Sequence, residues 1–577
     1  MSARHLIVGF DGFDLAIVRQ LGPEALPNVH AVMARGAFSA QRSVEPPATL
    51  PNWTTFLTGV DPGRHGVFDF TTRHGYDVRF SGGSVREAPS VVSRLDALGL
   101  RCACLFFPAT YPPERLAHGV FVSGWDAPVA FEADASFVWP PAMHASLVKR
   151  FGAQRFDDVD EFDADRDGWH TELPDALAAR VERKRQLATW LLEGERWDAF
   201  AVYFGESDTA GHYLYGLHDP RSPRHPSDHP GATRKPSGLA TVYMALDRAL
   251  GQLLTAAGGQ GGEAQVELTI VSDHGSGGSS DAVLYLNRAL AEAGLLTFHE
   301  SPWVMDVAKR VKELALTKLP PALRERLFGL FGTALPSALE SRARFGAIDF
   351  ARTVCFSDEL NYMPAVHLNL AGREPEGVVA RAEVPRVRAE ITAALMALRD
   401  PLTLAPVVAA VHRREDLFDG PFTERAPDLL LELHLDRGYS YNVMPSASAP
   451  PGTGPFRRLA PDEWLGRKGR SLPGSHRPNG FFAAAGPRIA AVGELDTQIA
   501  DATATWLARM DIAVPPEFAG RVLYEALREV TDASATDGRA SAPQRLPEGV
   551  RAGQGGPRDA ADEARIEARL RALGYVD

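Results

Sequence analysis

Three acidic residues follow apolar stretches that have the character of buried strands. Each stretch is short and continuously apolar, a pattern typical of strands covered on both faces in a parallel sheet. Ligands collect at the carboxyl edge of such a sheet, so we expect the three carboxylates to lie together there. Grouped carboxylates repel one another and resist the loss of water, and a cation would hold them together. The acids are Asp11, Asp208 and Asp273, behind the apolar stretches 6–10, 198–204 and 266–271.

Two of these acids have histidine neighbours. His212 comes four residues after Asp208, and His274 directly follows Asp273. His476 stands apart, in a glycine-flanked segment that we expect to be a loop. Carboxylate and imidazole ligands together favour zinc, with manganese as the second choice. Each pair also has a plain structural explanation, because the first could be a surface pair on a helix and the second a turn.

Thr49 lies where a short helix is expected to begin. Pro51 suits the first helical turn, and Gly59 suits the end of a helix. The start of a helix leaves backbone N–H groups unpaired and attracts anions such as phosphate. Thr49 is therefore either an ordinary N-cap or a hydroxyl placed to meet a phosphoryl group, and this stretch alone favours the N-cap.

Counting the possible ligands predicts two metal sites. Two ions about 3.5–4 Å apart can stabilise the attacking and the leaving oxygen of a phosphoryl group. One of them would lower the pKa of the threonine hydroxyl and make it a nucleophile. The two ligand sets are Asp208, His212 and His476 for one ion, and Asp11, Asp273, His274 and Thr49 for the other.

The composition is that of a large globular enzyme. The chain has 577 residues, of which 45% are hydrophobic and 23% are charged. A net charge of -12 argues against a nucleic-acid-binding surface. Three cysteines do not make a disulfide framework, and no apolar stretch is long enough to span a membrane. We expect a cytoplasmic protein that acts on a small molecule; its oligomeric state is left open.

Strand and helix patterns alternate along the chain, which favours a mostly parallel α/β sheet. Further strands are expected at 102–107, 365–370, 429–433 and 481–485, and helices at 91–98, 181–192, 239–254, 384–398 and 496–510. An amphipathic stripe from Val304 to Leu330 is typical of helix packing. The expected division is a catalytic α/β domain in two parts (1–297 and 441–529), an inserted smaller α+β unit beside the substrate (298–440), a flexible linker (530–560) and a C-terminal helix (561–577).

Several motifs, taken together, resemble the alkaline phosphatase superfamily. Their order and spacing are similar to the type I phosphodiesterase/nucleotide pyrophosphatase branch, and to bacterial proteins described as phosphohydrolases or phosphomutases. The motifs are Gly9-Phe10-Asp11-Gly12, Thr49-Leu50-Pro51-Asn52, the segment from Asp208 to His212, Ser272-Asp273-His274-Gly275 and Gly474-Ser475-His476.

This resemblance implies a fold, a reaction and a cofactor. The fold is an alkaline phosphatase-like three-layer α/β/α sandwich with a mostly parallel sheet and an inserted smaller α+β unit. The reaction is metal-dependent hydrolysis of a small phosphorylated substrate, of the phosphodiesterase or pyrophosphatase type, through a phosphothreonine intermediate at Thr49. The cofactor is a pair of divalent ions, zinc first and manganese second.

Other functions remain open on the sequence. A phosphomutase or phosphotransferase of the same superfamily would return the phosphoryl group to an organic acceptor. A sulfatase is disfavoured, because its nucleophile is a modified cysteine or serine and position 49 is threonine. A metal-stabilised binding protein without activity is the alternative from another class.

One position departs from the resemblance. The nucleotide pyrophosphatases carry an asparagine that touches a phosphate oxygen, and this chain has Phe70 there. Nucleotide specificity is therefore not expected to carry over. Asn52, Arg64 and Arg477 are the candidates to replace that contact, although a structural role is expected for each.

Overall fold

The computed structural model describes residues 4–80, 85–124, 135–152, 164, 166–259, 262–299, 345, 347–450, 452–466, 471–528, 544–547 and 550. The amphipathic stripe expected between Val304 and Leu330, the predicted C-terminal helix at 561–577 and most of the expected linker at 530–560 lie outside these residues. Within them, no helix has both the length and the apolar character needed to cross a bilayer.

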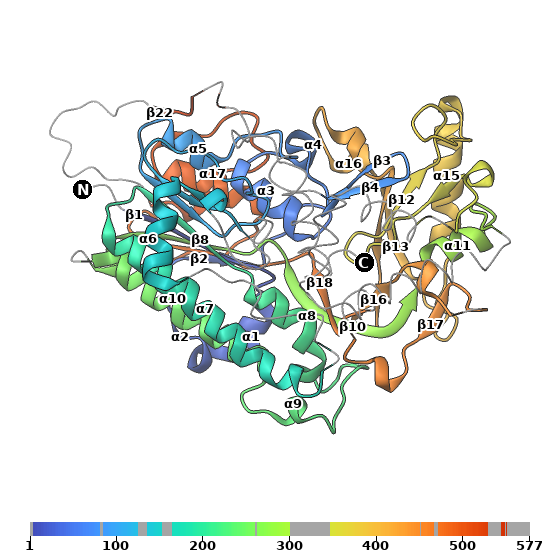
Figure 1. Ribbon diagram of the computed structural model, residues 1–577, viewed down its shortest axis with the longest axis horizontal. Coiled ribbons are helices and arrows are strands. Elements are labelled where there is room, and N and C mark those ends of the chain that lie inside the picture. Colours follow the sequence, from blue (N-terminus) through green and yellow to red (C-terminus); the bar gives the residue numbers. More distant parts are fainter. Residues whose placement is uncertain are drawn as a thin grey trace.

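The main sheet has nine strands among the described residues, and most of its neighbouring pairs are parallel (Figure 1). β9, β1, β8, β5 and β6 run in the same direction, whereas β19 and β7 run against their neighbours. The spatial order is β20 (Gly493–Glu494), β2 (Ala37–Ser39), β19 (Phe482–Ala485), β9 (Val266–Val271), β1 (Arg4–Phe10), β8 (Ala199–Phe204), β5 (Cys102–Leu105), β6 (Val120–Val122) and β7 (Val138–Trp139).

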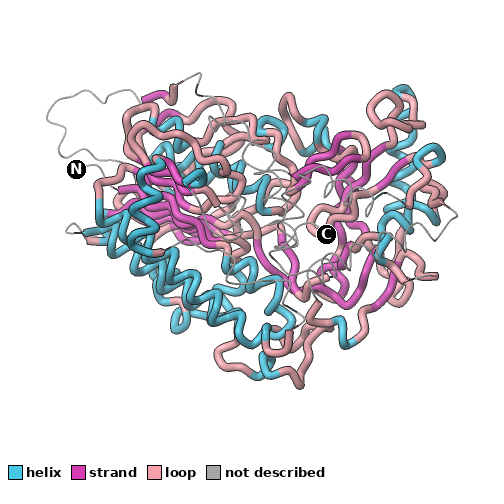
Figure 2. The backbone as a smooth tube through the Cα atoms, viewed as in Figure 1, coloured by secondary structure: helices cyan, strands magenta, loops and turns pink. Residues whose placement is uncertain are grey.

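Helices cover both faces of this sheet, as Figures 1 and 2 show. The covering explains why the central strands are apolar on both sides: every residue of β8 and β9 is buried. The predicted mostly parallel α/β/α sandwich is therefore confirmed. One face carries α1 (Leu15–Ala25), α2 (Pro27–Arg35), α7 (Trp169–Gly194) and α10 (Gly238–Gly258), and the other carries α3 (Thr49–Thr58), α5 (Val91–Asp96) and α17 (Ile499–Arg509).

Two smaller sheets form a second lobe, on the right of Figure 1. The first has the order β15 (Leu435–Asp436), β16 (Tyr439–Val443), β10 (Gly275–Leu284) and β17 (Phe456–Arg458), and β18 (Gly474–Arg477) also pairs with β10. The second has the order β11 (Cys355–Phe356), β12 (Ala365–Leu368), β14 (Leu429–Leu433) and β13 (Val408–Arg413), with α15 (Val384–Met396) packed on β13.

The long strand β10 joins the two lobes. It was missed in the sequence because it begins Gly-Ser-Gly-Gly-Ser-Ser, a composition typical of loops. It contributes to a sheet together with residues from 435 to 458, so elements from outside 298–440 share the smaller lobe. The division at residues 298 and 440 stays a prediction.

The remaining helices and strands are α4 (Pro62–His65), β3 (Thr71–His74), β4 (Asp77–Phe80), α6 (Pro141–Phe151), α8 (Glu206–His218), α9 (Pro230–Thr233), α11 (Leu286–Glu292), α16 (Arg414–Leu417), β21 (Ile512–Ala513) and β22 (Gln544–Arg545).

A buried ion pair fixes α17 against the main sheet. The Arg509 guanidinium donates to the Glu267 carboxylate, to Leu268 O at 3.1 Å and to Thr269 Oγ1 at 2.8 Å. Both side chains of the pair are almost completely buried. Loss of one partner leaves an uncompensated charge in the interior.

We expect Arg509→Met to lower the free energy of unfolding by about 3–5 kcal/mol, because Glu267 then loses its counter-charge inside the protein. The midpoint of thermal unfolding measures this change. The double variant with Glu267→Leu should recover most of the loss. A single variant as stable as the wild type would contradict this explanation.

Candidate active site

The carboxyl ends of three adjacent parallel strands meet at one edge of the main sheet. In the register of these strands Gly9 lies opposite both Tyr203 and Val271. Asp11 directly follows β1, and Asp273 lies two residues beyond β9. Asp208 lies in the first turn of α8, the helix that follows β8. Sheet geometry therefore brings the three acids to one place.

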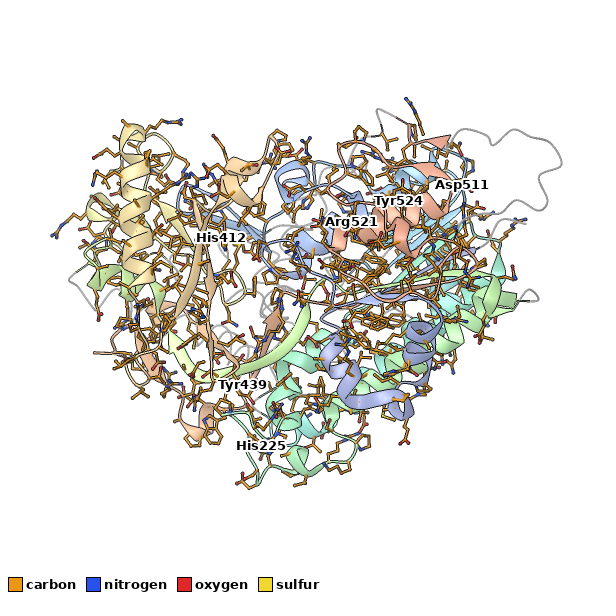
Figure 3. The ribbon with its side chains drawn as sticks, turned by 180° about the vertical axis from the view of Figure 1, so that it is seen from behind. His225, His412, Tyr439, Asp511, Arg521 and Tyr524 are labelled. Carbon is orange, nitrogen blue, oxygen red and sulfur yellow. The ribbon has the colours of Figure 1, made fainter. Side chains whose placement is uncertain are left out.

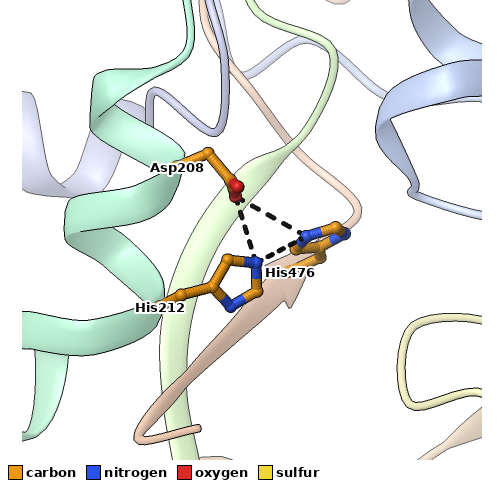
Figure 4. A group of neighbouring side chains, drawn as sticks. All are labelled: Asp208, His212 and His476. Carbon is orange, nitrogen blue, oxygen red and sulfur yellow. Dashed lines mark hydrogen bonds and ion pairs between the residues drawn. The ribbon is translucent and has the colours of Figure 1, made fainter. Parts of the chain in front are cut away.

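Asp208, His212 and His476 form the first group, shown in Figure 4. The Nε2 atom of His212 lies 3.3 Å from Asp208 Oδ1 and 3.0 Å from His476 Nε2. His476 Nε2 lies 3.6 Å from the same aspartate oxygen. Ligands of a tetrahedral zinc ion, each about 2.0–2.1 Å from the metal, are about 3.3 Å apart. The spacing of this group suits such an ion.

Asp11, Asp273 and His274 form the second group. His274 Nε2 lies 3.4 Å from Asp11 Oδ1 and 3.2 Å from Asp273 Oδ2. The two groups are in contact, because the rings of His274 and His476 stack with their centroids 3.7 Å apart. These are the two groups of this kind in the part of the chain that the structure describes.

Each aspartate of the second group has one oxygen held by the protein and one left over. Asp11 Oδ2 accepts hydrogen bonds from Trp53 Nε1 at 3.0 Å and from the Tyr203 hydroxyl at 2.6 Å. Asp273 Oδ1 accepts from the Gly12 N–H at 3.1 Å. Asp11 Oδ1 and Asp273 Oδ2 are buried and have no hydrogen-bond partner in the described structure. These oxygens face His274 Nε2, as metal ligands would.

The electrostatics of the second group also fit a cation. Burial, and then the nearby charge of Asp208, raise the pKa of Asp11 to about 8. Burial, and then the charge of Asp11, raise the pKa of Asp273 well above its usual value. The carboxylates are therefore costly to keep ionised by themselves. A divalent ion reverses this balance, because its charge is the largest in such a site.

The three histidines are oriented by their other ring nitrogen. Nδ1–H of His212 donates to Gly474 O at 3.1 Å, that of His476 to Pro47 O at 2.8 Å, and that of His274 to Gly275 O at 3.0 Å. Such hydrogen bonds fix the tautomer and leave the lone pair of Nε2 for a metal. Burial keeps two of these imidazoles neutral, since it lowers the pKa of His274 to about 3 and that of His476 well below its usual value.

His476 lies on strand β18, so the expected loop was wrong. Residues Gly474–Arg477 pair antiparallel with residues 275–278 of β10, and His476 is opposite Ser276. The glycines that suggested a loop serve a close approach instead. A Cβ atom on Gly474 would lie 2.0 Å from Gly211 O, in the helix that carries His212.

Thr49 is the first residue of α3, and its N-cap is Ala48. The N-cap interpretation of Thr49 is therefore wrong, because a cap precedes the helix and this residue lies in it. The Thr49 side chain is buried, and its Oγ1 lies 3.4 Å from His274 Nε2. The hydroxyl thus adjoins the second acid–histidine group.

The candidates to replace the family asparagine are occupied elsewhere. The Asn52 amide bridges Val44 and the carbonyls of Pro46 and Ala48, which holds the loop before α3. Arg64 pairs with Asp419, and Arg477 donates to Gly278 O at 3.0 Å. Phe70 is fully buried and packs edge-on against Tyr362.

Sequence reasoning missed the residues that support the ligands. Tyr203 lies in an apolar strand and Trp53 in a short helix, and neither carried a signal of a polar role. Tyr362 reaches the site from the smaller lobe, where its ring lies 5.6 Å from that of His476. Three histidines of the proline-rich segment 216–237, namely His218, His225 and His229, belong to neither group. His225, labelled in Figure 3, donates to Gly216 O at 2.7 Å.

Comparison with known proteins agrees with this arrangement. The sequence matches the family described as type I phosphodiesterase / nucleotide pyrophosphatase over residues 5–449. The chain belongs to this family. It is accordingly a phosphoric ester hydrolase with the fold of the alkaline phosphatase superfamily, as the motifs predicted. The matched range ends before His476, which the family comparison therefore does not reach.

Solved structures similar to this one come from mouse and human. Two are structures of murine ectonucleotide pyrophosphatase / phosphodiesterase 5. One is an inactive form of that protein in complex with AMP (13% identity, TM-score 0.48). The other is described by the protein's name alone (14% identity, TM-score 0.48). The third is the human protein of the same name (14%, 0.46). Each alignment covers 91% of this chain and 100% of the other. No curated protein sequence matches significantly.

We expect Gly474→Ala to weaken metal binding by at least about tenfold, the scale seen when the support of a metal ligand is disturbed. The added methyl group meets Gly211 O and pushes β18 away from α8, which separates His476 from His212. Titration with zinc and a competing chelator measures the affinity. Gly194→Ala is the matched control, since its Cβ would meet no atom within 4 Å. Equal affinity in both variants would contradict the close-approach argument.

Proposed function

We propose that this protein hydrolyses small phosphoric esters, of the phosphodiester or pyrophosphate type, with Thr49 as the nucleophile. One observation carries the proposal: the buried Thr49 hydroxyl lies beside two touching acid–histidine groups. A lone threonine would be an ordinary helix residue, and acid–histidine groups alone would be a structural metal site. Their combination is what a phosphoryl-transfer centre needs.

The metal ligands in this proposal are the two groups described above. Asp208, His212 and His476 would hold one divalent ion, and Asp11, Asp273 and His274 the other, with Thr49 as an additional oxygen ligand. The unpartnered oxygens of the second group and the Nε2 spacing of the first support this assignment. The mixed donors favour zinc, with manganese second. When bound, such ions supply positive charge to the hydroxyl and to the phosphoryl oxygens.

The chain itself contributes the nucleophile and its orientation. Thr49 Oγ would form a bond to phosphorus while the bond from phosphorus to the ester oxygen breaks, and the alcohol leaves with a proton. Water then cleaves the Oγ–P bond and restores the threonine. The N-terminus of α3 begins at this residue, so its unpaired N–H groups favour the anionic phosphoryl group.

A hydrolase is favoured over a phosphomutase, because the family is one of phosphodiesterases and pyrophosphatases. The finer specificity does not follow from the family. Phe70 provides a buried aromatic ring where the nucleotide pyrophosphatases carry an amide. We therefore extend the proposal to phosphoric esters in general and not to nucleotides in particular.

Thr49→Ala tests the nucleophile. We expect the turnover of a phosphodiester substrate to fall by at least about 10³-fold, as for other enzymes that lose a nucleophile. The bound metal, measured by elemental analysis, should fall little, because both carboxylates and the imidazole of that group remain. Thr54→Ala is a matched control on the same helix, since Thr54 Oγ1 has no hydrogen-bond partner in the described structure. Unchanged turnover in Thr49→Ala with metal bound would rule out the intermediate.

Metal content tests the two sites. We expect two divalent ions per chain, and about one after His476→Ala or Asp11→Asn, because each change removes a ligand from a different group. The midpoint of thermal unfolding should rise with added zinc in the wild type, since the ion binds only the folded chain. His225→Ala should keep both ions. Two ions in either ligand variant would refute the assignment.

A further inference from the structure

A loop of the smaller lobe carries an aromatic residue to the candidate active site. The Tyr362 ring lies 5.6 Å from the His476 ring at an interplanar angle of 22°, and 5.4 Å from the Phe70 ring at 74°. Phe70 is fully buried, whereas Tyr362 is partly exposed. Tyr362 also packs against the apolar clusters of both lobes. Packing against both clusters therefore holds Tyr362 beside the metal-ligand candidate His476.

The loop that holds Tyr362 is strained and firmly anchored. Glu359 has a φ of 54°, a backbone conformation that costs free energy for a residue other than glycine. Its buried carboxylate accepts from the Asn287 N–H at 2.8 Å and from the Ser446 hydroxyl at 2.7 Å. The side chain of Asn361 accepts from the Val443 N–H at 2.9 Å. Backbone strain persists only where surrounding contacts enforce it, and it gathers at functional sites.

We propose that Tyr362 is a specificity-determining residue whose exposed part contacts the group esterified to the phosphorus and favours a planar aromatic group there. This inference rests on the proposed function, which places the phosphoryl group at the two acid–histidine groups. A substituent on that phosphorus, where it leaves the site past His476, meets the ring of Tyr362, and the buried Phe70 packs against that ring. Aromatic rings gain stability from offset or edge contacts with one another, beyond the area they bury.

Binding of two simple phosphonates to the zinc-loaded protein tests the proposal. Phenylphosphonate and methylphosphonate carry the same anionic group and differ only in the substituent. We expect the wild type to prefer the phenyl compound, and Tyr362→Ala to reduce that preference by about 3–10-fold, the scale of an aromatic pair. Tyr362→Phe should keep the preference, because the ring remains. Isothermal titration calorimetry gives the dissociation constants.

The matched control is Tyr524→Ala, which removes a tyrosine ring that is 73% exposed (Figure 3). It should leave both affinities unchanged. Metal content is measured for every variant, and Tyr362→Leu, which keeps much of the volume, replaces Tyr362→Ala if the latter does not fold. In the kinetic assay, Tyr362→Ala should raise the KM for a diphenyl phosphoric ester and leave the KM for a dimethyl ester unchanged.

The possible failures are distinguishable. If the zinc-loaded wild type neither binds a phosphonate nor hydrolyses a phosphodiester, the proposed function is wrong. If it does both, but the preference for phenylphosphonate is absent or survives Tyr362→Ala, only the role of Tyr362 is overturned. Equal losses for the phenyl and methyl compounds would likewise overturn it, because they would indicate a structural effect on the whole site.

Discussion

The proximity of three carboxylates at one edge of the main sheet is the constraint on which the rest of the site depends. Neighbouring strands are about 4.8 Å apart, so acids at the ends of β9, β1 and β8 are forced into proximity once those strands pair. Their burial and mutual repulsion raise the pKa values of Asp11 and Asp273. Among the residues that the structure describes, no lysine or arginine pairs with Asp11 or Asp273. One oxygen of each of these two acids accepts from N–H or O–H donors, and the other oxygen has no hydrogen-bond partner there. A bound divalent cation would complete such an arrangement, because its charge offsets both carboxylates.

The helix α3 couples the nucleophile candidate to a ligand candidate. Thr49 and Trp53 are four residues apart on α3 and therefore lie on the same face. The first places its hydroxyl near His274, and the indole of the second donates to Asp11. The indole approaches β1 so closely that a Cβ atom on Gly9 would lie 2.7 Å from it. The glycine two residues before Asp11 is thus explained by packing, and one helix orients both chemical groups.

The features that could be predicted from the sequence are those that a local sequence pattern indicates. Continuous apolar stretches located β1, β8 and β9, and sheet geometry then implied that their acids converge. β10 and β18 were missed, because their glycines serve close backbone contacts and look like loop residues. The donors Trp53 and Tyr203 could not be found, since no local sequence pattern reveals which aromatic side chain will donate a hydrogen bond. Tyr362 depends on the packing of one lobe against the other, which no local pattern encodes.

The strand β10 connects the smaller lobe directly to the candidate active site. The first residues of β10 pair with β18, which carries His476, and its last residues pair with β16 and β17. Val443 at the end of β16 donates to Asn361, the neighbour of Tyr362. A continuous series of backbone and side-chain hydrogen bonds therefore connects a metal-ligand candidate to the loop that faces it. The distance between the rings of His476 and Tyr362 is set by this framework, so residues of the smaller lobe can define what fits beside the phosphoryl group.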